Sequence, residues 1–143
     1  MMLTIKRLKE LSPYKVYYRD LPWAGCFAYC KETLLQPFIQ IDNASPRELR
    51  YVTLLHELAH ARHYKRNCRC YREDNRALKE FHAERFTFRY LLRYKYTKAL
   101  KLAYEQTLET WPTYDEDYNK AFRLLEKDKI WKKVKNYLTN HKR

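Results

Sequence analysis

Two histidines four residues apart are the side chains of this 143-residue chain best suited to chemistry. They are His56 and His60, and Glu57 follows the first of them in an H-E-x-x-H pentapeptide. On a helix, residues four apart lie on one face, so both imidazoles would reach one metal ion. Glu57 would lie at the same site and take a proton from a metal-bound water. The pattern predicts one catalytic Zn2+ and favours a zinc-dependent endopeptidase that hydrolyses peptide bonds.

A zinc hydrolase needs a third protein ligand, and the segment 80–86 holds the candidates. Glu80 lies far enough beyond His60 for a loop and a returning helix, and Glu80 and Glu84 are one helical turn apart. One carboxylate could bind the metal while the other accepts a hydrogen bond from a ligand histidine and fixes its tautomer. We favour Glu80 as the ligand and Glu84 as its supporting partner, although the reverse assignment gives the same mechanism. His82 is a rival third ligand.

The pairing of H-E-x-x-H with a later E-x-x-A-[D/N/E]-x-F resembles the gluzincin pattern, and is most similar to the ImmA/IrrE-type metallopeptidases. The resemblance covers about residues 38–92. It implies that His56, His60 and Glu80 bind zinc, that Glu57 is the general base, and that Glu84 supports a ligand. It also implies a narrow regulatory protein substrate, such as a transcriptional repressor.

Two alternatives remain open on the same residues. With His82 as a ligand, the site would resemble the SprT-like proteases that act on protein–DNA crosslinks. The chain could also be a non-catalytic protein that binds nucleic acid or a partner on a zincin scaffold, but Glu57 favours an enzyme because a scaffold needs no base. Peptide hydrolysis usually requires a further donor to the oxyanion. His63, Tyr64 and a tyrosine of the C-terminal half are candidates.

Four cysteines offer a possible second metal site. Cys26 and Cys30 form a C-x3-C pair, while Cys68 and Cys70 form a C-x-C pair within a polar segment, 67–74, that we expect to be a loop. Free thiols are the expectation for a protein of the cytoplasm. A structural zinc is the alternative, but these spacings differ from the usual C-x2-C knuckle.

The chain is strongly basic, with 30 Lys and Arg against 17 Asp and Glu and a formal net charge of +13. Arg85, Arg89 and Arg93 recur every four residues, and tyrosines are interleaved with the cations that follow. The pattern predicts a surface that contacts a nucleic-acid backbone without sequence specificity. A solvated helix face or a surface for an acidic partner protein are the alternatives.

The absence of long apolar segments bears on localisation, and the length of the chain bears on its domain organisation. The chain has no apolar run of about 18 residues and no apolar signal core near its start, so we expect a cytoplasmic protein without a membrane partner. Its length suggests a single domain over 1–143. Within it we expect an N-terminal arm and β-sheet (1–45), the metal-binding helices (46–96) and a basic helical extension (97–143).

The predicted fold class is α+β and zincin-like, with a small antiparallel sheet of about three strands. A short basic helix is expected within 1–12 and a strand over 14–18, followed by a hairpin of 26–32 and 37–41. The strand Phe38–Ile41 precedes the active helix and is predicted to accept an extended peptide by strand addition.

Capping signals define the expected helices. Ser45 and Glu48 form a capping box for a helix from Pro46 to about Tyr64. A second long helix should cover 75–96 and continue, bent or broken, to about 108. Trp111-Pro112 is expected to end it, because the residue before proline disfavours helical geometry. A capping box over 113–116 opens a helix to about 127, and the last helix should cover about 129–138.

Overall fold

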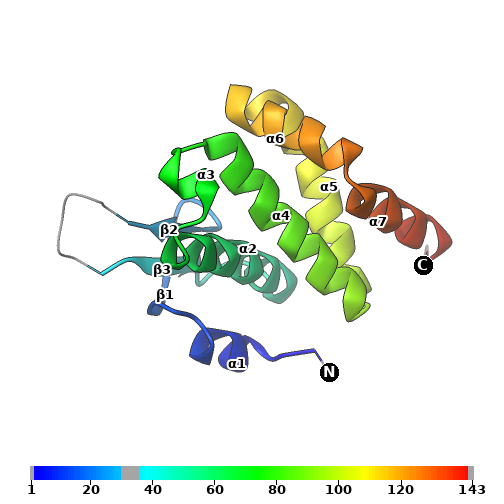
Figure 1. The fold of residues 1–143 in the computed structure, drawn as a ribbon. Coiled ribbons are helices and arrows are strands. Elements are labelled where there is room, and N and C mark those ends of the chain that lie inside the picture. The colour runs from blue at the N-terminus through cyan, green and yellow to red at the C-terminus, as the bar shows by residue number, and fades with distance from the viewer. Residues whose placement is uncertain (1, 30–35, 142–143) are drawn as a thin grey trace.

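The computed structural model describes residues 2–29 and 36–141, which form a small sheet and a larger helical part (Figure 1). The fold is α+β, as predicted. The elements are, in chain order, α1 (Ile5–Glu10), β1 (Val16–Arg19), β2 (Gly25–Ala28), β3 (Phe38–Asp42), α2 (Arg47–Lys65), α3 (Arg69–Arg72), α4 (Arg76–Arg93), α5 (Thr97–Tyr114), α6 (Glu116–Lys127) and α7 (Lys129–Asn140).

The sheet is mixed, so the prediction of an antiparallel sheet is wrong for one of its two strand pairs. Strand order is β1-β3-β2; β2 pairs antiparallel with β3, whereas β1 pairs parallel with it. The hairpin of β2 and β3 is as predicted, and its turn lies outside the described residues. This hairpin places β3 between the other two strands, and β3 runs in the same direction as β1 and opposite to β2.

The central place of β3 also overturns the prediction that Phe38–Ile41 accepts a peptide by strand addition. Both sides of β3 are already paired within the sheet. A backbone that donates and accepts on both sides has no edge left for another chain. The edge strands are β1 and β2.

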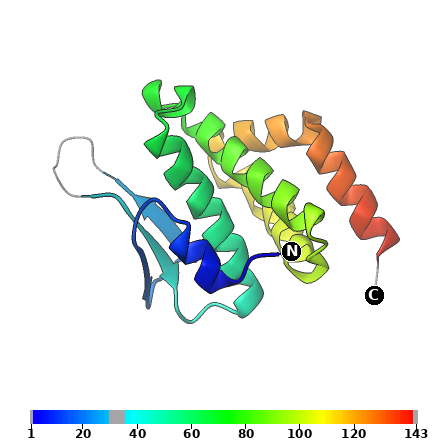
Figure 2. The ribbon, with the colours of Figure 1, turned by 60° about the horizontal axis from the view of Figure 1, so that its bottom comes forward.

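Helix α2 lies between the sheet on one side and α4 and α5 on the other (Figures 1 and 2). Ile39 and Ile41 point from β3 into the core and are fully buried, together with Leu54 and Leu55 of α2. The other side of α2 packs against α4 and α5. The sheet and the helical layer therefore pack on opposite sides of α2, and α2 carries the H-E-x-x-H residues. None of the described helices is long and apolar enough to span a membrane.

The start of α2 differs from the predicted capping box. The Ser45 hydroxyl donates to Asp42 Oδ2 at 2.9 Å instead of capping the helix. Pro46 occupies the cap position, with no side-chain cap hydrogen bond. Asp42, at the end of β3, also accepts from the Ala44 backbone. The turn between β3 and α2 is thus organised by an aspartate rather than by the serine.

The later helices confirm one expectation and correct two helix ends. The helix over 75–96 has a broken continuation, as expected, but the break comes earlier: α4 ends at Arg93, Lys95 turns the chain with a φ of 54°, and α5 follows. Pro112 does not end α5, which continues to Tyr114. Trp111 is buried there, and the Pro112 carbonyl accepts a hydrogen bond from the Asn119 side chain at 2.7 Å. Tertiary contacts of this kind offset the local preference against a helix before proline.

Segment boundaries elsewhere differ less. Asp115, within the predicted capping box, is the residue whose side chain caps α6, by accepting from the Tyr118 backbone at 2.8 Å. The segment 67–74, expected as a loop, contains the single-turn helix α3. Helix α7 begins where predicted, after Asp128 caps it, and extends to Asn140.

The only glycine, Gly25, packs where β2 meets both β3 and α2. A Cβ at this position would lie 2.6 Å from the Gln40 carbonyl oxygen and 2.7 Å from Thr53 Cγ2. We therefore expect Gly25→Ala to lower the free energy of unfolding by about 1–3 kcal/mol, because overpacking moves backbone. Urea denaturation would measure it. Asp20→Ala, at an exposed position nearby, is the matched control and should change stability by less than about 0.5 kcal/mol.

Candidate metal centre

Three side chains that the sequence singled out come together between α2 and α4. His56, His60 and Glu80 offer ligand atoms that all lie within 4.8 Å of one another. His56 Nε2 is 2.9 Å from Glu80 Oε2, and His60 Nε2 is 3.2 Å from Glu80 Oε1. The two Nε2 atoms are 3.1 Å apart. Two imidazoles and a carboxylate form a donor set that zinc hydrolases use.

The opposite ring nitrogens of both histidines have their own partners. His56 Nδ1 lies 3.2 Å from Glu84 Oε1, and His60 Nδ1 lies 3.1 Å from the Tyr71 hydroxyl. Glu84 in turn accepts a hydrogen bond from the Thr107 hydroxyl at 2.7 Å. These contacts fix both rings with Nε2 directed at the common point. Orienting partners of this kind tune metal affinity in known sites.

Burial and charge couple the members of this group. Burial opposes a charge on His56, but the hydrogen bonds and charges of Glu80 and Glu84 raise its pKa well above the usual range. Burial also opposes ionisation of Glu80, yet the two histidines hold the pKa of its carboxyl well below the usual range. The site therefore favours an ionised Glu80, which is the form that binds a metal.

Glu57 lies beside the ligand group, with only 8% of its surface exposed. Burial raises the pKa of its carboxyl, and the nearby His60 and His56 oppose this rise. The Phe27 backbone of β2 hydrogen-bonds to the same carboxyl. A carboxylate with a raised pKa is a better proton acceptor near neutral pH, which suits a general base.

A cleft of about 550 Å3 opens onto these residues, and we call it the metal cleft. Glu57, His60 and Glu80 form part of its lining. Its remaining lining residues come from β2, from α3 and its flanks, and from α4 and α6: Gly25, Cys26, Phe27, Tyr29, Tyr71, Asp74, Arg76, Lys79, Asp117 and Tyr118. A substrate in the cleft would thus contact both the sheet and the C-terminal helices.

Several of these residues were not anticipated from the sequence. Tyr71 and Thr107 contact the group through α3 and α5, and neither belongs to a recognisable motif. Lys79 is nearly buried, and its Nζ contacts Asp74 at 2.6 Å and the Tyr29 hydroxyl at 2.9 Å. Of the tyrosines that line the cleft, only Tyr118 had been indicated by the sequence, as one of the tyrosines of the C-terminal half that were candidates for the oxyanion donor.

Other predicted site residues lie elsewhere. His63 and His82 face each other, with ring centroids 5.6 Å apart, and both line a second groove rather than the metal cleft. Burial and the nearby His82 lower the pKa of His63 to about 4. Tyr64 packs against Tyr29 and Tyr71, which line the cleft, but it does not line the cleft itself.

The described cysteines do not form a metal group. Cys26, Cys68 and Cys70 are free thiols. Within residues 2–29 and 36–141, the one cluster of three or more possible ligands contains no cysteine. Cys30, which the alternative of a structural zinc also required, lies outside the described residues.

Residues 10–128 match the family model Peptidase_M78, whose description is IrrE N-terminal-like domain. The chain belongs to this family. The predicted resemblance to ImmA/IrrE-type proteins is confirmed, and it extends well beyond residues 38–92. No curated protein and no solved structure matches the chain significantly. Membership of a peptidase family agrees with the ligand group and suggests that this IrrE N-terminal-like domain is a metallopeptidase.

The contact of Glu84 with His56 Nδ1 should increase the affinity of the site for Zn2+. We expect Glu84→Ala to weaken Zn2+ binding about 10–100-fold, because the partner of His56 Nδ1 is lost. Thr107→Val removes the hydroxyl that bonds Glu84 and also the Ala103 carbonyl, and it should have a smaller effect in the same direction. Competition with a chromophoric chelator would give the affinities. Thr110→Val is the matched control, since its hydroxyl bonds only the Gln106 carbonyl at an exposed position; an equal loss there would contradict the assignment.

Proposed function

We propose that this protein is a zinc-dependent endopeptidase with a zincin-like active site. The observation that carries the proposal is the convergence of the His56 and His60 Nε2 atoms on the Glu80 carboxylate, at a cleft that Glu57, His60 and Glu80 line. Three protein ligands leave an open coordination position, which distinguishes a catalytic zinc site from a structural one. The donor set and the fixed Nδ1 atoms both fit zinc.

His56, His60 and Glu80 would hold the metal. When bound, zinc supplies a Lewis acid that activates water and polarises a peptide carbonyl. Glu57 would accept the proton of the attacking water and pass it to the leaving amine. Glu84 and Tyr71 would keep the two imidazoles oriented throughout. Their contribution is positional, because each contacts a histidine at Nδ1 and not at Nε2.

Tyr118 is our candidate for the donor to the developing oxyanion. It lines the metal cleft from α6, and its ring contacts Trp111, with centroids 4.9 Å apart. Trp111 in turn lies against the His56 ring. A phenol held next to the ligand group, in a partly buried cleft, is well suited to stabilise negative charge.

An extended substrate would bind along β2. This strand is an edge of the sheet, and Gly25, Cys26 and Phe27 line the metal cleft. Pairing with β3 uses the even-numbered positions of β2, because the Ala24 carbonyl bonds the Asp42 N–H. The backbone of Gly25 and Phe27 turns away from β3, and the Phe27 N–H is already bonded to the Glu57 carboxyl. A peptide added there would pass directly over Glu57.

The proposed substrate class rests on the family resemblance and on the residues that line the metal cleft. Resemblance to ImmA/IrrE-type proteins supports a narrow regulatory target, such as a transcriptional repressor, within the cytoplasm. The metal cleft is small, and its lining contains both acids and cations. One of these cations, Arg76, also bonds Asp115 at 2.9 Å. Such a lining favours selected peptide sequences over unselective digestion.

Glu57→Gln tests the proposal, because it removes the base without removing a ligand. We expect the variant to retain one zinc per chain and to lose cleavage by about 100-fold or more. Elemental analysis would measure the metal, and mass spectrometry of new N-termini in a proteome-derived peptide library would measure cleavage. Glu80→Ala should instead lose the zinc.

A control variant and two contradicting outcomes complete the experiment. Glu109→Gln, at an exposed position on α5, is the matched control and should behave as wild type. New termini that appear equally with Glu57→Gln would indicate a contaminating protease and contradict the proposal. Absence of zinc from the wild-type protein, even after zinc is added back, would do the same.

A further inference from the structure

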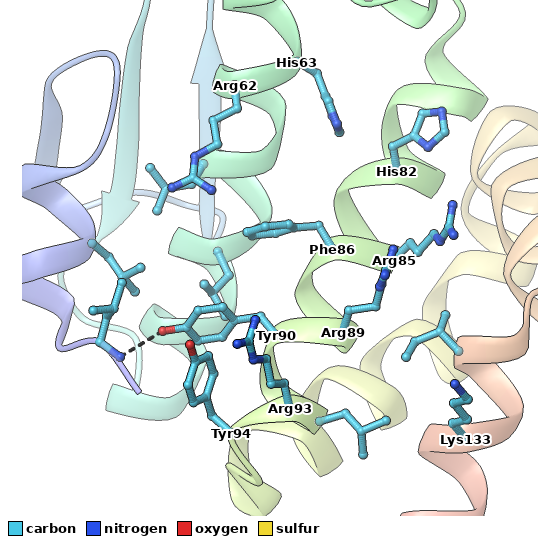
Figure 3. Close-up of a pocket in the computed structure, with 16 residues that line it drawn as sticks. Arg62, His63, His82, Arg85, Phe86, Arg89, Tyr90, Arg93, Tyr94 and Lys133 are labelled. Atoms are coloured by element: carbon cyan, nitrogen blue, oxygen red, sulfur yellow. Dashed lines mark hydrogen bonds between the residues drawn. The ribbon is translucent and has the colours of Figure 1, made fainter. Parts of the chain in front are cut away.

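A second depression lies between α2, α4 and α7, and we call it the basic groove (Figure 3). Its volume is about 740 Å3. Among the described residues, none lines both this groove and the metal cleft. On α2, Leu58 and Arg62 each follow a ligand histidine by two positions, which is about 200° around a helix. The groove is therefore a separate site.

Five cationic side chains line the basic groove and no acidic one does. They are Arg62 of α2, Arg85, Arg89 and Arg93 of α4, and Lys133 of α7. Arg85 lies 3.4 Å from Asp128, at the N-terminus of α7. The other four make no salt bridge with any acid in the described part of the chain. Gathering cations without counter-charges costs free energy, which an anionic ligand would recover.

The spacing of the α4 arginines suits a repeating anion. Arg85, Arg89 and Arg93 follow one another along one side of the helix, at intervals of four residues (Figure 3). Four residues of helix advance by about 6 Å. A row of guanidinium groups at this interval can contact successive phosphates of an extended strand, and arginine binds each phosphate through two parallel N–H donors.

Aromatic rings accompany the cations in the same groove. The rings of Tyr90 and Tyr94 are 4.8 Å apart, and the Tyr90 hydroxyl, which lies near the Tyr51 hydroxyl, accepts from the Leu3 backbone at 3.0 Å. The Arg62 guanidinium lies over Phe86, 5.6 Å from the ring centroid. Rings next to cations offer stacking surfaces for bases, in addition to charge for the backbone.

We propose that the basic groove binds single-stranded nucleic acid through its phosphate backbone, without sequence specificity. Rings that lie among the cations can stack on unpaired bases, which a duplex does not offer, so the groove suits a single strand. An acidic protein segment would use the arginines but has no bases to stack on Tyr94. Leu3 and Lys133 lie outside the matched range of 10–128, so the groove depends on parts of this chain beyond the family domain.

Fluorescence anisotropy with a labelled 12-nucleotide oligothymidylate tests the proposal and requires no peptidase activity. We expect Arg89→Gln/Arg93→Gln to weaken binding at least about tenfold at low salt, and to reduce the slope of log K against log salt by about 1.4. The matched control is Lys120→Gln/Arg123→Gln, two exposed cations of α6 outside the groove, which should bind within about twofold of wild type.

A second variant separates nucleic acid from other polyanions. Tyr94→Leu keeps the charge and should weaken oligothymidylate binding about fivefold or more, with an unchanged salt slope, because stacking is lost. Circular dichroism melting and zinc content would show that each variant folds as the wild type does.

Three outcomes would overturn the proposal. One is equal loss of binding in the α6 control, which would mean diffuse attraction to a basic protein. Another is tighter binding to a 12-base-pair duplex than to the single strand. The last is displacement by polyglutamate at equal charge concentration together with no effect of Tyr94→Leu, which would assign the groove to an acidic protein partner.

Discussion

The interior of this protein is organised by two glutamates that α4 places against two histidines of α2. The side chains of Glu80 and Glu84 are only 12% and 8% exposed, and each contacts a ring nitrogen of His56. Buried carboxylates are tolerated only when they are paired and hydrogen-bonded. The pairing therefore restrains the distance and rotation between α2 and α4. Tyr71 from α3 and Thr107 from α5 join the same network, and four helices consequently depend on the residues that form the candidate metal centre.

Local sequence signals were sufficient for the residues of this network that lie on α2 and α4. The four-residue spacing of His56 and His60, and of Glu80 and Glu84, is a property of one helix face, and the structure brings both pairs together. The parallel pairing of β1 with β3 was not predictable in the same way. It depends on which strand of the β2–β3 hairpin packs beside β1, and no local pattern encodes this. Tyr71 and Thr107 escaped notice because their contacts cross between helices and leave no periodic pattern.

Two local rules failed where other contacts were stronger: a turn contact in the case of Ser45, and packing between α5 and α6 in the case of Pro112. Ser45 is a good N-cap by residue type, but Asp42 at the end of β3 accepts its hydroxyl. Pro112 would end an isolated helix, but the buried Trp111 and the bond from Asn119 to the Pro112 carbonyl continue α5 for two more residues. That extension matters for the site, because it holds the Trp111 ring between His56 and Tyr118. Propensity is a weak prior when several buried contacts oppose it.

The two sides of the helix pair α2–α4 differ in where acidic residues lie. Glu57 and Glu80 line the metal cleft together with His60, Arg76 and Lys79, whereas the basic groove on the other side has arginines in its lining and no acid. Residues that share no partner and lie well apart generally contribute to free energy additively. Selection acting on the groove would therefore leave the ligand geometry unchanged, and the reverse also holds. A lineage could exchange what the arginines recognise through a few surface substitutions while the buried network, and any chemistry that depends on it, is inherited intact.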